Sequence, residues 1–292
     1  MTAGPGQEAV QARRDETDAV SFSFADVEAG LCGFARLGLT GEGAERTGSA
    51  LAVLFSGREP VAAIAEGDVE VAPDAGWEAL TLPGLGASVD APLERWSVRM
   101  AGERHAWALT FEATSPPAGH APVGGMAGYE QLCRVTGEVT AAGGDVREVD
   151  ASGQRGHGWG RPDWRRLGAV HTVSAWLGDD QGVALTRAHA AGDKGHDADE
   201  RWGALLTSTG AVEIADPRVS TTYDAEGRQR RAGLELWVED GEDGSHPHRA
   251  AGTVLCGSSL ELGQLRLDCA FMRWTMEGGV GVGRYDVLRR AG

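Results

Sequence analysis

The chain of 292 residues is long enough for one large domain or two ordinary ones, and 41% of its residues are hydrophobic. A formal net charge of −16 excludes nucleic acid and anionic membranes as main partners, because both require a basic face. Apolar runs fall well short of the roughly 18 residues that a membrane-spanning helix needs. Residues 1–18 lack the apolar core of a secretory signal, so we expect a disordered tail there and a soluble, cytoplasmic protein.

The four cysteines are widely spaced and form no Cys-x-x-Cys motif. Each one lies in an apolar or strand-like context: Cys32, Cys133, Cys256 and Cys269. This pattern predicts buried free thiols rather than disulfides or a zinc site.

Beyond the tail, the chain consists of short alternating runs separated by turn residues, and it contains 44 glycines. Apolar side chains recur with period two over residues 107–113, 170–176, 234–239 and 265–271. Such runs, bounded by turn signals every 8 to 12 residues or so, indicate antiparallel β-sheets of the sandwich or barrel kind. Amphipathic helical windows are scarce, and residues 162–167 are expected to form one short helix.

Two domains are predicted. The segment Thr140–Asp150 interrupts the strand pattern before the pattern resumes. Placing a boundary there gives an N-terminal domain over residues 19–145 and a C-terminal domain over residues 146–292. Each part has the length of one small β-barrel or sandwich.

The stretch over residues 153–164 has the most unusual composition in the chain. It holds four glycines, two tryptophans, two arginines, a histidine and an aspartate. Glycine and proline disfavour a helix interior, and the glycines also weaken an ordinary strand. This composition suits a place where the backbone approaches another group closely and polar and aromatic side chains converge.

Two side chains of this stretch are candidates for proton transfer. His157, flanked by glycines, can act as an acid or base near neutral pH; alternatively, its ring nitrogens tie two strands together. Asp163 becomes an acid if the neighbouring aromatic groups desolvate it; alternatively, it caps a helix or pairs with Arg155 or Arg161. Arg155 can also bind a ligand oxygen bidentately.

The aromatic residues allow two interpretations as well. Nine tryptophans against three tyrosines suit a protein that encloses a large apolar ligand. Trp159 and Trp164 can line such a pocket, although core packing is the commoner role of tryptophan.

The remaining motifs are weak, and no metal site or cofactor is predicted from them. His246 and His248 form a His-x-His pair within a stretch typical of an exposed loop, and His189 and His196 also have loop-like neighbours. The glycines at residues 281–283 lack the third glycine and the helix of a dinucleotide-binding loop.

The chain resembles the AttH-like and carotenoid 1,2-hydratase (hydroxyneurosporene synthase) superfamily. Its central signature is Gly-x-x-Arg-Asp-His-Ser-Trp-Gly followed by Arg-Asp-Trp, and the matching segments here are Gly153–Gly160 and Asp163-Trp164, preceded by Tyr129–Val139. Supporting similarity covers residues 92–96, 109–113 and 279–285. The chain departs from the signature at Gly156 and Gly158, where the family has Asp and Ser, and Arg161-Pro162 reverses the usual order.

The resemblance implies an all-β fold of two lipocalin-like (calycin) β-barrel or sandwich domains with an apolar cavity. The superfamily includes cofactor-free hydratases of isoprenoids, and it is similar to calycin-type cyclases and Diels–Alderases. We therefore expect a cofactor-independent enzyme that hydrates, cyclises or isomerises an apolar terpenoid or polyketide-like molecule. The oligomeric state is left open.

Site roles follow from this expectation. The candidate acids and bases are His157 and Asp163, with Glu112 and Glu130 in reserve. Arg155 would orient the substrate, and the cavity would be lined by Trp159, Trp164, Trp107 and Tyr129. Two alternatives remain: a carrier that binds a hydrophobic ligand without changing it, and a purely structural polar network between the domains.

Overall fold

The computed structural model describes residues 8–11, 16–178, 180–193, 195–196, 198–239 and 245–291. The chain divides into two compact units, which confirms the predicted all-β class of two lipocalin-like barrel domains. The N-terminal domain comprises residues 1–122 and 126–161, and the C-terminal domain comprises residues 123–125 and 162–292. The division after Arg161 differs from the expected one at residue 145, which falls inside a hairpin of the N-terminal domain.

The N-terminal domain is a single antiparallel sheet of eleven strands. In the order β4-β3-β2-β1-β11-β10-β8-β7-β6-β5, neighbouring strands are hydrogen-bonded, and β9 pairs with β10. The strands are β1 (Thr17–Asp26), β2 (Leu31–Thr40), β3 (Thr47–Ser56), β4 (Glu59–Glu70), β5 (Ala79–Leu82), β6 (Leu85–Ala91), β7 (Arg95–Ala101), β8 (Ala106–Ala113), β9 (Ala118–Val123), β10 (Met126–Thr140) and β11 (Val146–Gly160). A 3-10 turn, η2 (Gly43–Glu45), links β2 to β3.

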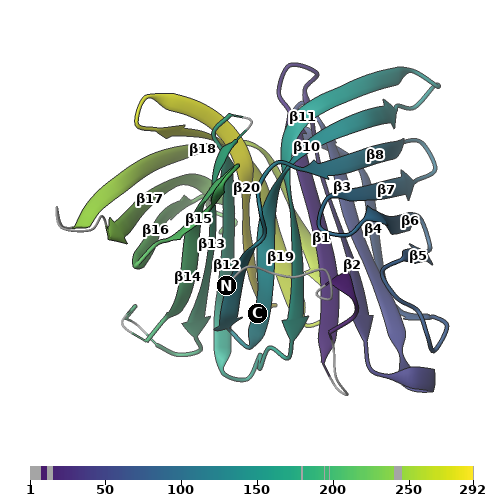
Figure 1. The fold of residues 1–292 in the computed structure, drawn as a ribbon, viewed down its shortest axis with the longest axis horizontal. Helices are drawn as coiled ribbons and strands as arrows, with labels where there is room; N and C mark the ends of the chain where they lie inside the picture. Colours follow the sequence, from purple (N-terminus) through teal and green to yellow (C-terminus); the bar gives the residue numbers. More distant parts are fainter. Residues whose placement is uncertain are drawn as a thin grey trace. The chain divides into compact units, whose positions relative to one another are not determined.

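This sheet curls on itself, so that β5 and β6 approach β2 and β3. In Figure 1 the teal β11 lies beside the purple β1, although the two strands are far apart in the sequence. The long β10–β11 hairpin is thus joined to both halves of the sheet.

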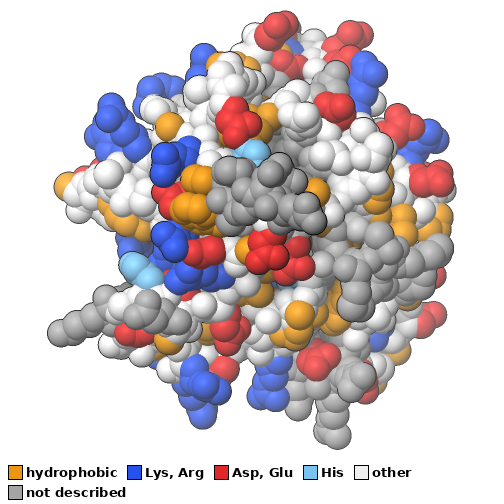
Figure 2. Space-filling view, turned by 60° about the vertical axis from the view of Figure 1, so that its left-hand side comes forward, with side chains coloured by type: hydrophobic (Ala, Val, Ile, Leu, Met, Phe, Trp, Pro, Cys, Tyr) orange, Lys and Arg blue, Asp and Glu red, His pale blue; other side chains and the backbone are white. Residues whose placement is uncertain are grey.

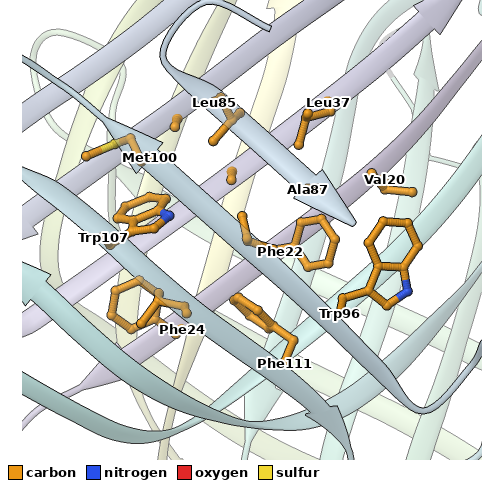
Figure 3. Packing of buried hydrophobic residues seen from close by; sticks show 14 of the residues in the cluster. Val20, Phe22, Phe24, Leu37, Leu85, Ala87, Trp96, Met100, Trp107 and Phe111 are labelled. Carbon is orange, nitrogen blue, oxygen red and sulfur yellow. The ribbon is translucent and has the colours of Figure 1, made fainter. Parts of the chain in front are cut away.

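The inside of the N-terminal barrel is filled with large aromatic side chains from β1, β7 and β8. Phe22 packs against Trp96 and Phe111, with ring centroids 5.3 and 5.1 Å away, and Phe24 meets Trp107 edge-on at 5.8 Å (Figure 3). Each of these side chains occupies an alternate position of its strand, as the period-two pattern over residues 107–113 predicts. Burying them supplies much of the domain's hydrophobic stabilisation.

The C-terminal domain is a second antiparallel sheet, of nine strands. Its order is β15-β14-β13-β12-β20-β19-β18-β17-β16. The strands are β12 (Leu167–Trp176), β13 (Gln181–Ala190), β14 (Glu200–Thr207), β15 (Gly210–Glu213), β16 (Asp216–Tyr223), β17 (Gln229–Glu239), β18 (Ser245–Leu262), β19 (Leu265–Met276) and β20 (Gly279–Arg290). The two ends of this sheet also approach each other, because β14 contacts β16.

Two glycines of β20 allow the strand to lie very close to β12. A Cβ atom added at Gly281 would lie 2.0 Å from the Trp176 carbonyl oxygen, and one added at Gly283 would lie 2.1 Å from that of Ser174. Only glycine fits such an approach without moving the backbone. The Gly-Val-Gly sequence is therefore a packing device inside a strand.

Two local predictions are corrected by the structure. Residues 162–167 form a single turn instead of a helix, with the amides of Arg166 and Leu167 donating to the Asp163 carbonyl oxygen. The tail expected to be disordered through residue 18 is ordered at residues 8–11 and from residue 16 onward, whereas residues 1–7 and 12–15 lie outside the described residues.

The thiol prediction is confirmed, because all four cysteines are free and buried. Burial raises the pKa of Cys133 to about 12, and it does the same for Cys269. In the part of the chain that the structure describes, no helix is long and apolar enough to cross a membrane.

Candidate active site

The central motif forms β11, and strand alternation turns three of its side chains into the N-terminal barrel. Arg155, His157 and Trp159 share one face of β11, and the opposite positions on β1 are Phe22, Val20 and Asp18. Phe22 and Val20 belong to the core, so this face is the interior of the barrel.

His157 is paired with a carboxylate deep inside this domain. Its Nε2 atom lies 2.6 Å from Oδ1 of Asp18, and both side chains are 0% exposed. The same oxygen accepts a hydrogen bond of 2.9 Å from the Trp77 indole, and the Gln11 amide donates to Oδ2. A carboxylate held in this way accepts a proton from Nε2 and fixes the orientation of the imidazole ring.

Aromatic rings surround His157. The rings of Trp159, Tyr129 and Trp77 stand edge-on to it, with centroids at 5.2, 5.6 and 6.1 Å. Trp159 is half-buried, which places this cluster near an end of the barrel interior. Tyr129 and Trp159, two of the residues expected to line a cavity, thus lie beside His157.

A second buried ion pair involves Arg155, which lies two residues before His157 on β11. Arg155 Nη2 donates to Glu8 Oε1 over 2.7 Å, with side-chain exposures of 1% and 6%. Glu8 also accepts a 2.8 Å hydrogen bond from the Leu93 amide. The Arg155 guanidinium lies over the rings of Trp96 and Tyr129, at 5.7 and 5.5 Å from their centroids. These contacts hold the cation in place.

Burial and charge act in opposite directions on this pair. Burial works against the charged form of Arg155, but Tyr129 and Glu8 outweigh it, and the pKa of Arg155 lies above its ordinary value. Burial raises the pKa of Tyr129, so this phenol stays protonated at neutral pH.

Several polar atoms of the cluster are buried and find no hydrogen-bond partner among the residues that the structure describes. They are His157 Nδ1, Arg155 Nε, Glu8 Oε2 and Gln131 Oε1. A buried polar atom without a partner costs roughly 1–3 kcal/mol, so proteins rarely retain several of them in one place without a use. The cluster therefore keeps unused hydrogen-bonding capacity beside the Asp18–His157 pair.

The other predicted site residues do not join this cluster. Asp163 is exposed in the C-terminal domain, where it accepts a 3.0 Å bond from the Arg165 amide, and Trp164 is half-buried on the same turn. Glu112 is exposed and pairs with Arg95 over 2.8 Å. Trp107 is buried in the core against Phe24. The carboxylate beside His157 is that of Asp18, whereas Asp163 accepts a hydrogen bond within its own turn.

Glu130 explains one departure from the family signature. It lies opposite Gly156 in the β10–β11 register and is half-buried on the face away from His157. A Cβ atom at Gly156 would come within 2.6 Å of the Glu130 carboxylate, which accepts a 2.7 Å bond from Gln154. The signature has an aspartate at the position of Gly156 on β11. In this chain a carboxylate lies beside that position too, but it belongs to Glu130 of the neighbouring strand β10.

The residues that sequence reasoning missed come from the start of the chain and from distant strands. Asp18 begins the alternation that continues through Val20, Phe22 and Phe24, and a charge on such an apolar face is a signal that could have found it. Glu8 has no comparable signal, because its segment reaches Arg155 only through the tertiary fold.

A second polar cluster lies in the C-terminal domain. The Asp199 carboxylate, 0% exposed, is approached by His189 Nδ1 at 2.7 Å, Arg187 Nε at 2.8 Å and His196 Nδ1 at 3.3 Å. His189 lies on β13, in contrast to the loop expected for it, and His248 belongs to β18. The side chain of His246 lies outside the described residues.

These features define a two-domain β-barrel protein with a buried polar cluster in its N-terminal barrel. The chain belongs to the family described as a domain of unknown function (DUF7064), whose profile matches residues 6–291. No curated protein matches it.

Solved structures with the same fold are remote in sequence. An AttH protein (NE1406) from Nitrosomonas europaea is 12% identical over 95% of this chain and 93% of that chain, with a TM-score of 0.69. Kievitone hydratase from Nectria haematococca is 8% identical over 99% and 93%, with a TM-score of 0.67. CghA with Sch210972 is 14% identical over 95% and 89%, with a TM-score of 0.64. These structures share the all-β fold that the resemblance to the AttH-like superfamily implies for this chain.

Proposed function

We propose that this protein is an enzyme that transfers a proton to or from an apolar small molecule, with His157 as the acid–base residue. The observation that carries the proposal is the Asp18–His157 pair, 2.6 Å apart and fully buried; the second ring nitrogen, Nδ1, has no hydrogen-bond partner within the described part of the chain. Each reaction expected from the sequence, hydration, cyclisation or isomerisation, can begin with such a proton transfer.

Asp18 and His157 divide the work in the proposed chemistry. The carboxylate accepts the Nε2 proton and stabilises an imidazolium when one forms, so Nδ1 is the atom that exchanges a proton with substrate. As the imidazolium, His157 protonates an alkene carbon; water then adds to the cation, or a ring closes, and the proton that the product loses returns to the neutral imidazole. As the neutral base, it removes a proton beside a carbonyl group. The buried surroundings exclude bulk water from these steps.

Arg155 and Tyr129 are the proposed partners of the substrate's oxygen. The Arg155 guanidinium has an unused Nε–H, and it can stabilise negative charge on an enolate oxygen. The raised pKa of Tyr129 keeps its hydroxyl available as a donor. Glu8 now occupies one side of Arg155, so substrate entry requires residues 8–11 to move away from the cluster.

The aromatic surroundings support an apolar, unsaturated substrate. Trp77, Tyr129 and Trp159 present ring edges to His157, and such walls bind hydrocarbon and stabilise a cationic intermediate if they turn a ring face toward it. The names of two proteins with this fold, a hydratase and CghA bound to Sch210972, agree with chemistry on compounds of this kind. A carrier for the same class of ligand is the second candidate, favoured by the complete burial of the ion pairs.

The test is proton exchange in D₂O. Purified protein is incubated with a panel of unsaturated terpenoids and polyketide-like ketones, and products are analysed by mass spectrometry for deuterium at carbon. Tryptophan fluorescence, titrated in parallel, reports binding. Wild type is compared with His157→Gln and Asp18→Asn, and Glu112→Gln serves as a control because Glu112 is exposed and outside the cluster.

We expect wild type and Glu112→Gln to give deuterated product, and both cluster variants to lose at least about 100-fold in rate. Fluorescence changes without any product would favour the carrier. If His157→Gln folds as wild type does and retains full exchange, the acid–base role of His157 is wrong.

A further inference from the structure

We propose that His189, His196 and Asp199 of the C-terminal domain form a binding site for a divalent transition-metal ion of the zinc type. The three side chains offer one ligand atom each, and these atoms all lie within 4.8 Å of one another. The proposal is independent of the chemistry assigned to His157, which belongs to the other domain.

The spacing of the ligand atoms suits a tetrahedral ion. With bonds of about 2.0–2.1 Å, two tetrahedral ligand atoms lie about 3.3 Å apart. His196 Nδ1 and Asp199 Oδ2 are already 3.3 Å apart, whereas His189 Nδ1 lies 2.7 Å from the other oxygen of the same carboxylate and has to shift slightly to reach an ion at Oδ2. His196 can make the adjustment, because its side chain is 65% exposed.

Asp199 supplies the second observation that points to a bound ion. Its side chain is 0% exposed, and among the described residues none makes an aligned hydrogen bond to its Oδ2 atom, although Arg187 Nε lies 2.8 Å away. The close arginine offsets part of the charge without satisfying the oxygen's lone pairs. A buried carboxylate with an unused oxygen is costly unless a further partner binds it.

The structure also provides partners beyond the ligand atoms. His189 Nε2 lies 3.2 Å from the Asp193 carbonyl oxygen, so Nε2 can carry the proton and donate it there while Nδ1 binds the ion. Metal binding then replaces the proton that Nδ1 shares with Asp199. Arg187 Nη2 lies 3.4 Å from His196 Nδ1, and this cation lowers the affinity below that of a four-ligand structural zinc centre.

The donor set selects the class of ion. Two imidazoles and one carboxylate favour Zn²⁺, Co²⁺ or Ni²⁺ over Mg²⁺ and Ca²⁺, which prefer oxygen ligands. Three protein ligands leave a fourth position for water. Asp199 also lines an open pocket of about 540 Å³, together with Arg201, Asp216 and Arg218, which gives the ion a route from solvent. On the face in Figure 2, acidic and basic side chains are interleaved.

The test is metal binding by the full chain without an affinity tag, after dialysis against a chelator. Isothermal titration with Zn²⁺ gives stoichiometry and affinity, and the visible absorption of Co²⁺ reports a tetrahedral site. His196→Ala is the main variant, because this exposed side chain can be removed without disturbing the core. Asp199→Asn is a second variant. His248→Ala is the control: His248 is also surface-accessible and lies 2.5 Å from a carboxylate of Glu277.

We expect one Zn²⁺ per chain, with an affinity at least about 10-fold lower in His196→Ala and in Asp199→Asn, and unchanged in His248→Ala. The tetrahedral Co²⁺ band should disappear in the same two variants. No zinc binding by wild type, or equal binding by wild type and His196→Ala, would overturn the proposal. Loss of binding in His248→Ala alone would also overturn it, since the ion would then lie elsewhere.

Discussion

The two barrels each bury a carboxylate beside a histidine, but they differ in what surrounds the pair. In the N-terminal barrel, Asp18 and His157 are both fully buried among aromatic rings, and Trp77 and Gln11 occupy the remaining carboxylate positions. In the C-terminal barrel, Asp199 is equally buried, but His189 is 20% exposed and His196 is 65% exposed. Asp18 is surrounded by buried side chains, whereas Asp199 contacts histidines that are partly or largely exposed to solvent.

This difference underlies the two proposals, proton transfer at His157 and ion binding at Asp199. A histidine held by a buried carboxylate in aromatic surroundings keeps one orientation and excludes water, as general acid–base catalysis requires. A histidine with an exposed ring, such as His196, can rearrange around an ion at small cost. Under the two proposals, similar residue types serve different functions in barrels of one fold class.

The largest expected effect comes from removing the counter-ion of Arg155. Glu8→Ala leaves the guanidinium buried without a carboxylate, which should lower the free energy of unfolding by about 3–5 kcal/mol. Glu8→Gln, which keeps an acceptor for the Leu93 amide, should lose less. Urea unfolding followed by tryptophan fluorescence measures both. Equal stability of wild type and Glu8→Ala would mean that Glu8 does not hold Arg155 in solution.

The next largest effect is a pH dependence of the free energy of unfolding, which comes from His171 in the C-terminal barrel. Burial, with Arg187, lowers the pKa of His171 from 6.5 to about 4, against the opposing charge of Asp199; His189 and His196 lower it further. The unfolded chain therefore binds the proton more readily than the folded one between pH 6.5 and 4. Stability present above pH 6.5 is lost as the pH falls toward 4, by about 3 kcal/mol.

His171→Gln isolates this contribution from that of the carboxylates. The variant should be less stable than wild type at pH 7, where it loses the 2.8 Å contact with the Tyr285 hydroxyl, but its stability should fall less between pH 6.5 and 4. Urea unfolding of metal-free protein at several pH values measures the difference. Parallel pH curves for the two proteins would contradict the lowered pKa.

A smaller effect on the free energy of unfolding is expected where Gly156 of β11 lies against the Glu130 carboxylate of β10. Gly156→Ala places a methyl group 2.6 Å from Glu130, which must leave Gln154, so we expect a loss of about 1–2 kcal/mol. Glu130→Ala should relieve the clash, so the double variant should be more stable than the sum of the single changes predicts. Additive losses would show that the two positions do not interact.

The smallest effect is expected at the surface. Glu112→Ala removes an ion pair with Arg95 in which both side chains are more than half exposed. Salt and water screen such pairs, so the urea midpoint should stay within experimental error of the wild type. A clear fall in the midpoint would mean that Glu112 contributes more than its surface contact indicates.

The β-sheet content and several inward faces could be predicted from sequence because alternation is a local property of a strand. Trp107, Leu109 and Phe111 are buried as their period-two spacing predicts, and the central motif does contribute Arg155 and His157 to a buried cluster. The domain boundary could not be located in the same way, because a long hairpin and a domain junction both interrupt the alternation with a turn.

By itself the sequence determined the all-β class, the buried thiols and the choice of the central motif, since composition and periodicity follow from short segments. Only the tertiary structure decided which carboxylates pair with Arg155 and His157 of the central motif. Asp18 and Glu8 lie 139 and 147 positions from His157 and Arg155 in sequence, and the closure of the N-terminal sheet brings them together. Pairing between distant strands is set by the whole sheet, so the sequence around His157 does not identify Asp18 as its partner.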